Sequence, residues 1–457
     1  MKHLYTFFGI LFAISILYYL YIQNISMNHN KSNVEKKSVI VVWAGMAGLI
    51  AAKDLQSFWF DVVVLEASAR IWGRLFTTAL SSGTTVDLWA SRIHGIRNNP
   101  IKTLIDDNAI TTTMTDYDNR VIYQNQTQIP EKVINRWEQL YEKFRDYVEE
   151  ESDTTQDTGL DIYVYDYMQQ LKKEDRKIFL HTIQNETTND IAADPAQIST
   201  LDILKQSDLQ GDDAFVHGYM QLATNIASWL NIITGSHVHT IDYQGTGVIV
   251  SYNTGKNMYA DYVIVTVPLG VLQKKIITFV PWLPTDKIHA IDGLAMWVLN
   301  KTFLEFDTVF WDKNQDIIGY TDHPQWARSF WVNVYKYVNK PILLWLNGWS
   351  YATQLESKTD QEIVAEAMKS LTSMYGKHIP QPTHYAISRR SVDKNSYGAY
   401  SFVPVWATDM YYDVLAESVY DKIFFAWEAT HKKHHSTVLG AYLSGKREAK
   451  KIYDLGQ

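Results

Sequence analysis

The sequence of 457 residues contains no cysteine. Disulfide bonds, thiolate metal ligands and cysteine nucleophiles are therefore excluded. The formal net charge is −8, and this excess of negative charge argues against a nucleic-acid partner while being compatible with a cationic substrate. A chain of this length has room for two or three domains and a large core.

Glycine is also scarce, with 22 residues, whereas tryptophan is abundant, with 15. The scarcity matters between Ser38 and Thr78, where an apolar β-branched run, a turn at 43–48, an apolar helical pattern and a second apolar run ending in Glu66 follow one another. This order predicts a βαβ unit of dinucleotide-binding type. The turn of such a unit holds a pyrophosphate against bare backbone, and the acid that closes the second strand binds a ribose hydroxyl.

The first glycine of the expected G-x-G-x-x-G turn is missing, because Trp43 stands there. Glu66 lies at the expected distance from the turn. An indole at the turn would crowd the pyrophosphate, and it would add about 1–2 kcal/mol of strain if its φ is positive. As written, the predicted site is damaged.

One long uncharged apolar run is present, from Leu4 to Ile22, and no small-residue cleavage site follows it. Its length is sufficient to span a bilayer, so we expect an uncleaved single-pass anchor and tether over 1–37 and a membrane localisation. A cleaved signal peptide or a buried helix is the alternative. Lysines flank both ends of the run, so the orientation in the membrane stays open.

Patterns typical of a cofactor-binding sheet recur along the chain. The segment 99–210 has a mostly helical pattern, apolar strands return at 248–251 and 261–267, and a last strand at 423–426 precedes a helix. These patterns predict a two-domain α/β (α+β) fold with a discontinuous Rossmann-like domain and an inserted substrate domain of mixed sheet and helices. We expect the first domain over 38–98, 211–293 and 420–453, and the second over 99–210 and 294–419.

Four blocks of the sequence resemble the flavin-containing amine oxidases, most closely the polyamine oxidase branch. They are VIVVWAGMAG at 39–48, LEASARIWGR at 65–74, DLWASRIHG at 87–95, and WEATH with STVLGAYLSG at 427–445. The blocks occur in the order of the family, with Val-Pro-Leu-Gly-Val-Leu between them, and the resemblance spans about 38–453. It implies an FAD cofactor, held non-covalently because cysteine is absent.

The resemblance also implies which residues form the site. Those assigned to the cofactor are Trp43, Gly45, Met46, Ala47 and Gly48 at the pyrophosphate, Glu66 at the ribose, Arg74 near the phosphates, Val238 at the adenine, and Trp427, Glu428, Thr437 and Val438 beside the flavin. Those assigned to catalysis are Lys301, which would hold a water at flavin N5, His94, which would contact a distal amine or the solvent path, and Tyr400, which would form an aromatic wall. Without the resemblance, each of these three would be interpreted as a solvated or structural side chain.

Two further groups of polar side chains are considered. Asp190 and Asp194 are candidate partners for the remaining cationic nitrogens of the substrate. The histidine- and lysine-rich loop at 431–435 is interpreted as solvated charge, and no metal site is expected.

The implied reaction is the oxidation of an amine C–N bond. An uncharged amine would lose hydride to the flavin, the imine would hydrolyse to an aldehyde and a smaller amine, and molecular oxygen would then be reduced to hydrogen peroxide. A monoamine or L-amino-acid oxidase of the same family is one alternative. The other is a flavin-free, catalytically inactive, membrane-tethered binding protein, which the tryptophans as written favour.

The positions at which this chain differs from the family motifs involve the same few residue types each time. The family has glycine where this chain has Trp43, Trp72, Trp89 and Trp427, and tryptophans 59, 229, 297, 349 and 406 follow the same pattern. Tryptophan is common in the family where this chain has Arg92 and Arg390. Random decay would also have damaged Glu66, Arg74 and Glu428, which are intact. We hypothesise that the source organism reads the codon UGA as glycine, and CGA or CGG as tryptophan. The prediction of an enzyme depends on glycine at positions 43, 72, 89 and 427.

Overall fold

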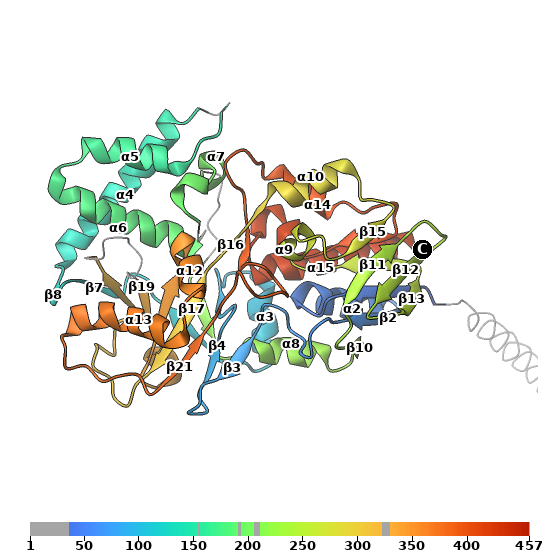
Figure 1. Ribbon diagram of the computed structural model, residues 1–457, viewed down its shortest axis with the longest axis horizontal. Helices are drawn as coiled ribbons and strands as arrows, with labels where there is room; N and C mark the ends of the chain where they lie inside the picture. Colours follow the sequence, from blue (N-terminus) through green and yellow to red (C-terminus); the bar gives the residue numbers. More distant parts are fainter. Residues whose placement is uncertain (1–35, 154–155, 191–192, 205–210, 322–329, 457) are drawn as a thin grey trace, which may run out of the picture.

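The computed structural model describes residues 36–153, 156–190, 193–204, 211–321 and 330–456. The chain forms two regions that lie side by side (Figure 1). A parallel sheet with its helices makes one region, and a mixed sheet with a helical cap makes the other. The fold is therefore a two-domain α/β fold, as the strand and helix patterns predict.

A five-stranded parallel sheet forms the centre of the first region, in the order β10-β2-β1-β14-β23. Its strands are β1 (Ser38–Val42), β2 (Asp61–Leu65), β10 (Ile232–Ile233), β14 (Tyr262–Val265) and β23 (Ile423–Phe425). These strands are continuous apolar runs because helices and loops cover both faces of the sheet. β1, α2 (Met46–Ser57) and β2 form the predicted βαβ unit, which is confirmed.

Helix α15 (Val438–Leu455) packs closely against α2. The approach needs a residue without a side chain, since a Cβ on Gly445 would lie 2.4 Å from the carbonyl oxygen of Ala47. The C-terminal helix is thereby held beside the turn that follows β1.

Smaller sheets and helices complete the first region. They are the sheet of β11 (Val238–Asp242), β12 (Val248–Tyr252), β13 (Lys256–Ala260) and β15 (Thr278–Val280), the hairpin of β3 (Thr77–Ala79) and β4 (Thr85–Asp87), the sheet of β5 (Arg92–Ile93), β6 (Thr112–Thr115) and β9 (Asp213–Val216), and helices α3 (Pro100–Asp107), α8 (Met220–Ala227), α9 (Leu269–Gln273), α10 (Thr285–Gly293) and α14 (Met410–Ala416).

The second region is built on a seven-stranded mixed sheet, in the order β21-β17-β20-β19-β18-β7-β8. Its strands are β7 (Arg120–Gln124), β8 (Thr127–Gln128), β17 (Asn300–Glu305), β18 (Ile317–Tyr320), β19 (Phe330–Asn333), β20 (Ile342–Asn347) and β21 (His384–Ile387). Helix α13 (Asp360–Tyr375) packs Ile363 and Leu371 into the same core as Trp331 and Trp345 of the sheet. The short pair β16 (Ala295–Trp297) and β22 (Tyr400–Phe402) and the helices α11 (Tyr335–Val338) and α12 (Trp349–Glu356) complete this half.

A helical cap covers one end of this sheet (Figure 1). It consists of α4 (Glu131–Glu151), α5 (Leu160–Gln170), α6 (Lys173–Asp190) and α7 (Thr200–Ile203). The cap helices α4, α5 and α6 bury Phe144, Val164 and Phe179 against one another. The segment that the pattern describes as mostly helical thus also contributes strands β7 and β8 to the mixed sheet.

The predicted transmembrane helix requires a correction. The run from Leu4 to Ile22 lies outside the described residues, and none of the helices within them is long and apolar enough to cross a membrane. The predicted single-pass anchor, and the membrane localisation that depends on it, are therefore not supported.

Candidate active site

A cavity of about 1580 Å³ lies where the two regions meet. Its lining comes from the turn after β1, from the loops around residues 72–75 and 89–94, from strands of the mixed sheet, and from the C-terminal block at 427–438. Ligands of open α/β sheets bind at the carboxyl ends of the parallel strands, where the β1 turn lies. Four sequence blocks that are far apart along the chain therefore meet around one space.

Glu66 fixes the backbone of the turn after β1. The side chain is buried, and its Oε2 accepts the N–H of Ala44 at 2.8 Å. Oε1 accepts the N–H and the hydroxyl of Ser68, both at 2.8 Å. Burial raises the pKa of Glu66, although these hydrogen bonds oppose the rise.

The indole of Trp43 fills the slot beside this turn. An ideal Cβ on Gly45 would lie 3.4 Å from Trp43 Cδ1, and one on Gly73 would lie 3.1 Å from Trp43 Nε1. Trp43 and Trp89 line both the main cavity and a pocket of about 10 Å³ that also contains Glu66. A pyrophosphate close to the bare backbone of the turn needs the volume that this indole fills. The nucleotide therefore does not fit beside tryptophan at position 43.

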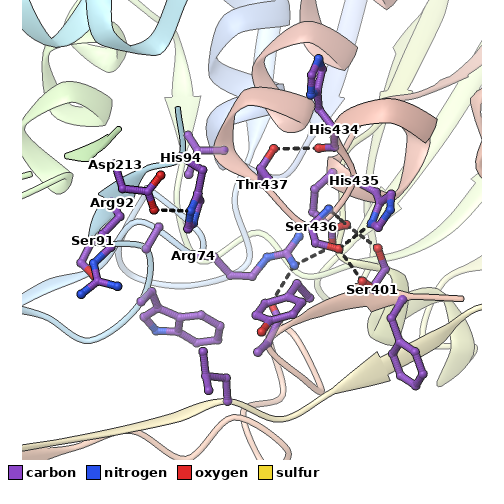
Figure 2. Close-up of a pocket in the computed structure, with 18 of the residues that line it drawn as sticks. Arg74, Ser91, Arg92, His94, Asp213, Ser401, His434, His435, Ser436 and Thr437 are labelled. Atoms are coloured by element: carbon purple, nitrogen blue, oxygen red, sulfur yellow. Dashed lines mark hydrogen bonds and ion pairs between the residues drawn. The ribbon is translucent and has the colours of Figure 1, made fainter. Parts of the chain in front are cut away.

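The surrounding residues do fit a flavin nucleotide. Arg74 Nη1 donates to Glu428 Oε1 at 2.7 Å and to the carbonyl of Ala399 at 2.9 Å. Glu428 Oε2 accepts the hydroxyl of Ser401 at 2.7 Å and the N–H of Ser436 at 3.3 Å. Arg74, Ser401 and Ser436 lie together on one side of the cavity (Figure 2).

The N-terminus of α15 opens onto the same cavity. Thr437 caps the helix, since its hydroxyl accepts the N–H of Gly440 at 3.0 Å and donates to the carbonyl of His434 at 2.7 Å (Figure 2). Thr437 and Val438 line the cavity. A helix N-terminus presents free N–H groups and a partial positive charge, which suit an electron-rich group.

Lys301 lies in β17 and is buried, and its ammonium group donates three hydrogen bonds. Its Nζ donates to the carbonyl of Asp87 at 3.1 Å, to the hydroxyl of Ser91 at 2.7 Å and to the carbonyl of Trp89. Burial and the charge of Arg390 lower the pKa of Lys301 well below its ordinary value. The lysine thereby ties the loop at 87–91 to the mixed sheet.

Arg390 places a second cation against this loop. Its guanidinium carbon lies 3.4 Å from the centre of the Trp89 ring, and an N–H donates to the carbonyl of Leu88. Burial and the charge of Arg74 lower the pKa of Arg390 to about 9, although Asp393 opposes this. Arginine normally stays protonated far above this pH, so a pKa this low indicates that the guanidinium is poorly solvated.

The other predicted residues take different places. His94 and Tyr400 line the cavity, as do Met46, Ala47 and Trp427, whereas Val238 in β11 is buried outside the lining. Asp194 accepts the N–H of Ser350 at 3.2 Å and does not line the cavity. Asp190 is the last residue of α6, and its side chain lies outside the described part.

Sequence patterns missed the acidic residues that do line the cavity. These are Asp118, Glu138, Glu142, Asp202, Asp212, Asp213 and Asp409. They come from the cap helices, from loops and from the start of β9, where a carboxylate resembles any solvated charge. The pairing of β5 with β9, which brings Asp213 beside His94, leaves no mark in the sequence around either residue.

Comparisons with known proteins agree with this geometry. A family model described as flavin containing amine oxidoreductase matches residues 46–453. Lysine-specific histone demethylase 1 homolog 2 of Arabidopsis thaliana is 34% identical over 91% of this chain and 58% of its own length. Probable polyamine oxidase 4 of the same plant is 30% identical over 91% of this chain and 86% of its own length.

The chain spans about half the length of the demethylase relatives, at 58% and 54% for the Arabidopsis protein and a homolog from Oryza sativa subsp. japonica. Among solved structures, putrescine oxidase bound to putrescine shares the fold with a TM-score of 0.77 at 16% identity, over 92% of this chain and 99% of the other. The family match begins at Met46, inside the turn after β1, and covers the rest of the cavity lining together with the C-terminal block. The chain belongs to the flavin-containing amine oxidoreductases, and its cofactor is FAD.

Proposed function

We propose that this chain oxidises the C–N bond of a small cationic amine, a polyamine or diamine, and gives an aldehyde, a smaller amine and hydrogen peroxide. The observation that carries the proposal is the convergence of the four family blocks on one large cavity, which several carboxylates also line. Carboxylates suit a substrate with more than one ammonium group. Molecular oxygen is the proposed electron acceptor.

The proposed roles follow from the places of the side chains. Gly45, Glu66, Arg74, Glu428 and Thr437, with the neighbouring backbone, would hold FAD, which supplies the two-electron acceptor when bound. Lys301, which is buried beside the cavity, would keep the loop at 87–91 in place. To hold a water near the reacting atoms, its Nζ would exchange one of these three hydrogen bonds for the water. Tyr400 would exclude water from the reacting carbon as one wall of the cavity.

Peroxide release from a panel of amines tests the proposal. Putrescine and longer polyamines should be oxidised faster than a monoamine or an L-amino acid. The demethylase relatives motivate a second candidate, an N-methylated lysine side chain, because one of them is 34% identical to this chain. A peptide that carries N-methyl-lysine therefore belongs in the panel, and faster oxidation of any compound other than the polyamines would replace the proposed substrate.

The proposal depends on glycine at the four positions where tryptophan crowds the cofactor. Among the described non-glycine residues with positive φ, Trp43 and Trp72 have the largest values, 96° and 95°, while the others lie between 49° and 70°. Such values belong to a region that favours glycine, and a bulky side chain there is strained. The backbone at these two positions thus has the conformation that glycine adopts readily.

Some of the tryptophans form two classes that differ in burial and in backbone conformation. Trp331 and Trp345 are fully buried and stack with their ring centres 5.8 Å apart, and the indole N–H of Trp311 donates to Asn333 at 2.8 Å. In contrast, Trp59 and Trp406 have positive φ and are 76% and 75% exposed. Tryptophan is a highly buried residue on average. The second class therefore supports the hypothesis that UGA specifies glycine in the source.

The surroundings of Arg390 support the second part of the hypothesis, in which tryptophan belongs where this sequence has arginine. It is a buried guanidinium stacked on Trp89, and burial depresses its pKa. With glycine at position 89 and tryptophan at position 390, a neutral aromatic side chain would replace the buried charge and the indole at position 89 would be gone. Glycine at position 89 would therefore leave the space that tryptophan at position 390 needs.

Mass spectrometry of protein from the source tests the hypothesis directly. Peptides with glycine at positions 43, 72, 89 and 427 are expected, and tryptophan at these positions would end it. In parallel, the combined variant W43G/W72G/W89G/W427G/R390W should retain FAD through gel filtration, whereas the sequence as written should not. If the sequence as written binds FAD equally well, the glycine requirement is wrong.

A further inference from the structure

Asp213 and His94 face each other across two paired strands. β9 runs antiparallel to β5, with Ile93 opposite Ala214. His94 directly follows β5, and Asp213 is the first residue of β9, so the pairing brings the two residues close together. His94 Nδ1 lies 2.9 Å from Asp213 Oδ2 (Figure 2). The pair is fixed by the sheet and not by a flexible contact.

The carboxylate of Asp213 accepts several hydrogen bonds. Oδ1 accepts the N–H of Gly95 at 3.0 Å, and Oδ2 also accepts the hydroxyl of Tyr117 at 3.0 Å. Burial by itself would raise the pKa of Asp213, but the hydrogen bonds from His94 and from the N–H of Gly95 hold this pKa below its ordinary value. Asp213 is therefore ionised at neutral pH.

An ionised carboxylate can only accept hydrogen bonds. The ring nitrogen that faces it, Nδ1 of His94, must therefore carry the proton. In the neutral imidazole the other nitrogen, Nε2, is then an acceptor. His94 lines the cavity with its side chain 50% exposed, and none of the described residues hydrogen-bonds to Nε2.

We propose that Asp213 is a positioning residue that holds His94 in the Nδ1-protonated tautomer, so that Nε2 takes a proton from a substrate ammonium in the cavity. In this step the N–H bond of the ammonium breaks and the Nε2–H bond forms. The electron pair of the broken bond stays on the substrate nitrogen, which becomes the neutral amine. The imidazolium that results is stabilised by the carboxylate of Asp213. The inference rests on the proposed function, because it requires an amine substrate.

Other charged and titratable groups face the same pair. Arg92 Nη1 donates to the hydroxyl of Tyr117 at 2.6 Å, and Arg97, Asp118 and Asp212 line the cavity nearby in sequence. Since none of these other groups contacts His94 in a hydrogen bond within the described chain, Asp213 is the group that sets its tautomer.

Nitrogen-15 NMR of histidine-labelled protein tests the positioning without turnover. The His94 resonances are assigned by their loss in His94→Gln. The expected result is a protonated Nδ1 and an unprotonated Nε2 in the parent protein, with a mixture of tautomers in Asp213→Asn. A protonated Nε2 in the parent protein would overturn the proposal.

The value of kcat/KM on the FAD-loaded glycine-restored protein provides the second readout. Asp213→Asn should lower kcat/KM for the amine by about tenfold or more. FAD retention and Tm should change little. An unchanged kcat/KM in Asp213→Asn would also overturn the proposal.

A matched control is available elsewhere in the fold. Glu305 Oε2 lies 3.6 Å from Nδ1 of His384, and neither residue lines the cavity. Glu305→Gln should leave kcat/KM unchanged. If no amine is oxidised by any version of the protein, the proposed function fails, whereas the tautomer measurement still decides the role of Asp213.

Discussion

Arg74 Nη1 lies 2.7 Å from Glu428 Oε1, although 354 positions separate the two residues in the chain. Glu428 is almost fully buried, and Arg74 also donates to the carbonyl of Ala399. This ion pair joins the loop after β2 to the block before α15. It therefore connects both ends of the parallel-sheet region directly at the cavity.

Removing the carboxylate from this pair should destabilise the fold. Glu428→Ala leaves a largely buried guanidinium without its partner, and a loss of about 2–4 kcal/mol in the free energy of unfolding is expected. Urea denaturation measures this value. The exposed pair of Lys450 and Asp454, at 2.8 Å, is the control, since Asp454→Ala should cost no more than about 0.5 kcal/mol. Equal losses in the two variants would contradict the structural role of the buried pair.

The two classes of tryptophan should respond in opposite ways to glycine. Trp345→Gly removes a buried, stacked indole and should cost about 3–5 kcal/mol or more. Trp59→Gly and Trp406→Gly remove exposed side chains at positive φ, so relief of about 1 kcal/mol of strain should keep or raise Tm. Differential scanning calorimetry compares the three variants. A loss of Tm at position 59 or 406 would argue for tryptophan there.

Lys301→Met tests whether this lysine takes part in amine oxidation. The variant loses three hydrogen bonds to the loop at 87–91, and amine oxidation should slow by at least about tenfold. Stopped-flow absorbance of the glycine-restored protein follows flavin reduction and reoxidation separately. Unchanged rates in both half-reactions would remove Lys301 from the mechanism.

His181 should make stability depend on pH on the acid side. This residue of α6 is buried edge-on against Trp137, and burial, with the charge of Arg120, lowers its pKa from 6.5 to about 3. Between these values the unfolded chain binds more protons than the folded one, so the free energy of unfolding rises with pH. Stability should therefore fall as the pH is lowered from 6.5 toward 3.

Urea midpoints at several pH values measure this dependence. His181→Phe keeps an aromatic ring in the same place but cannot titrate, so it should flatten the slope. A slope that is the same in both proteins would assign the acid sensitivity to other groups.

The elements with strong periodicity were predictable from the sequence. The βαβ unit, the strand at 423–426 and the helix beginning at Val438 have the expected types and places. Their apolar pattern is continuous and long, so local preference and burial agree. The strands β7 and β8 are not predictable in this way because they are short and partly polar. β7 pairs with β18, almost 200 positions away, and β8 pairs only with β7.

The site was predictable only where the family resemblance covers it. Arg74, Glu428 and Thr437 lie around the cavity, and the roles given to them stay predictions. Asp194 was chosen by charge alone and lies elsewhere, bonded to Ser350. The contact between His94 and Asp213 depends on strand register, which no local pattern specifies. The predicted domain boundaries stay a prediction as well.

The segment that follows β23 and the start of helix α15 supply one side of the cavity, while the turn at 43–48 supplies the other. During synthesis on the ribosome, the turn leaves the exit tunnel long before its partner segments exist. The nascent chain must therefore keep an incomplete nucleotide cradle until the final helix docks on α2. Cofactor capture in the cell should accordingly be a post-translational event.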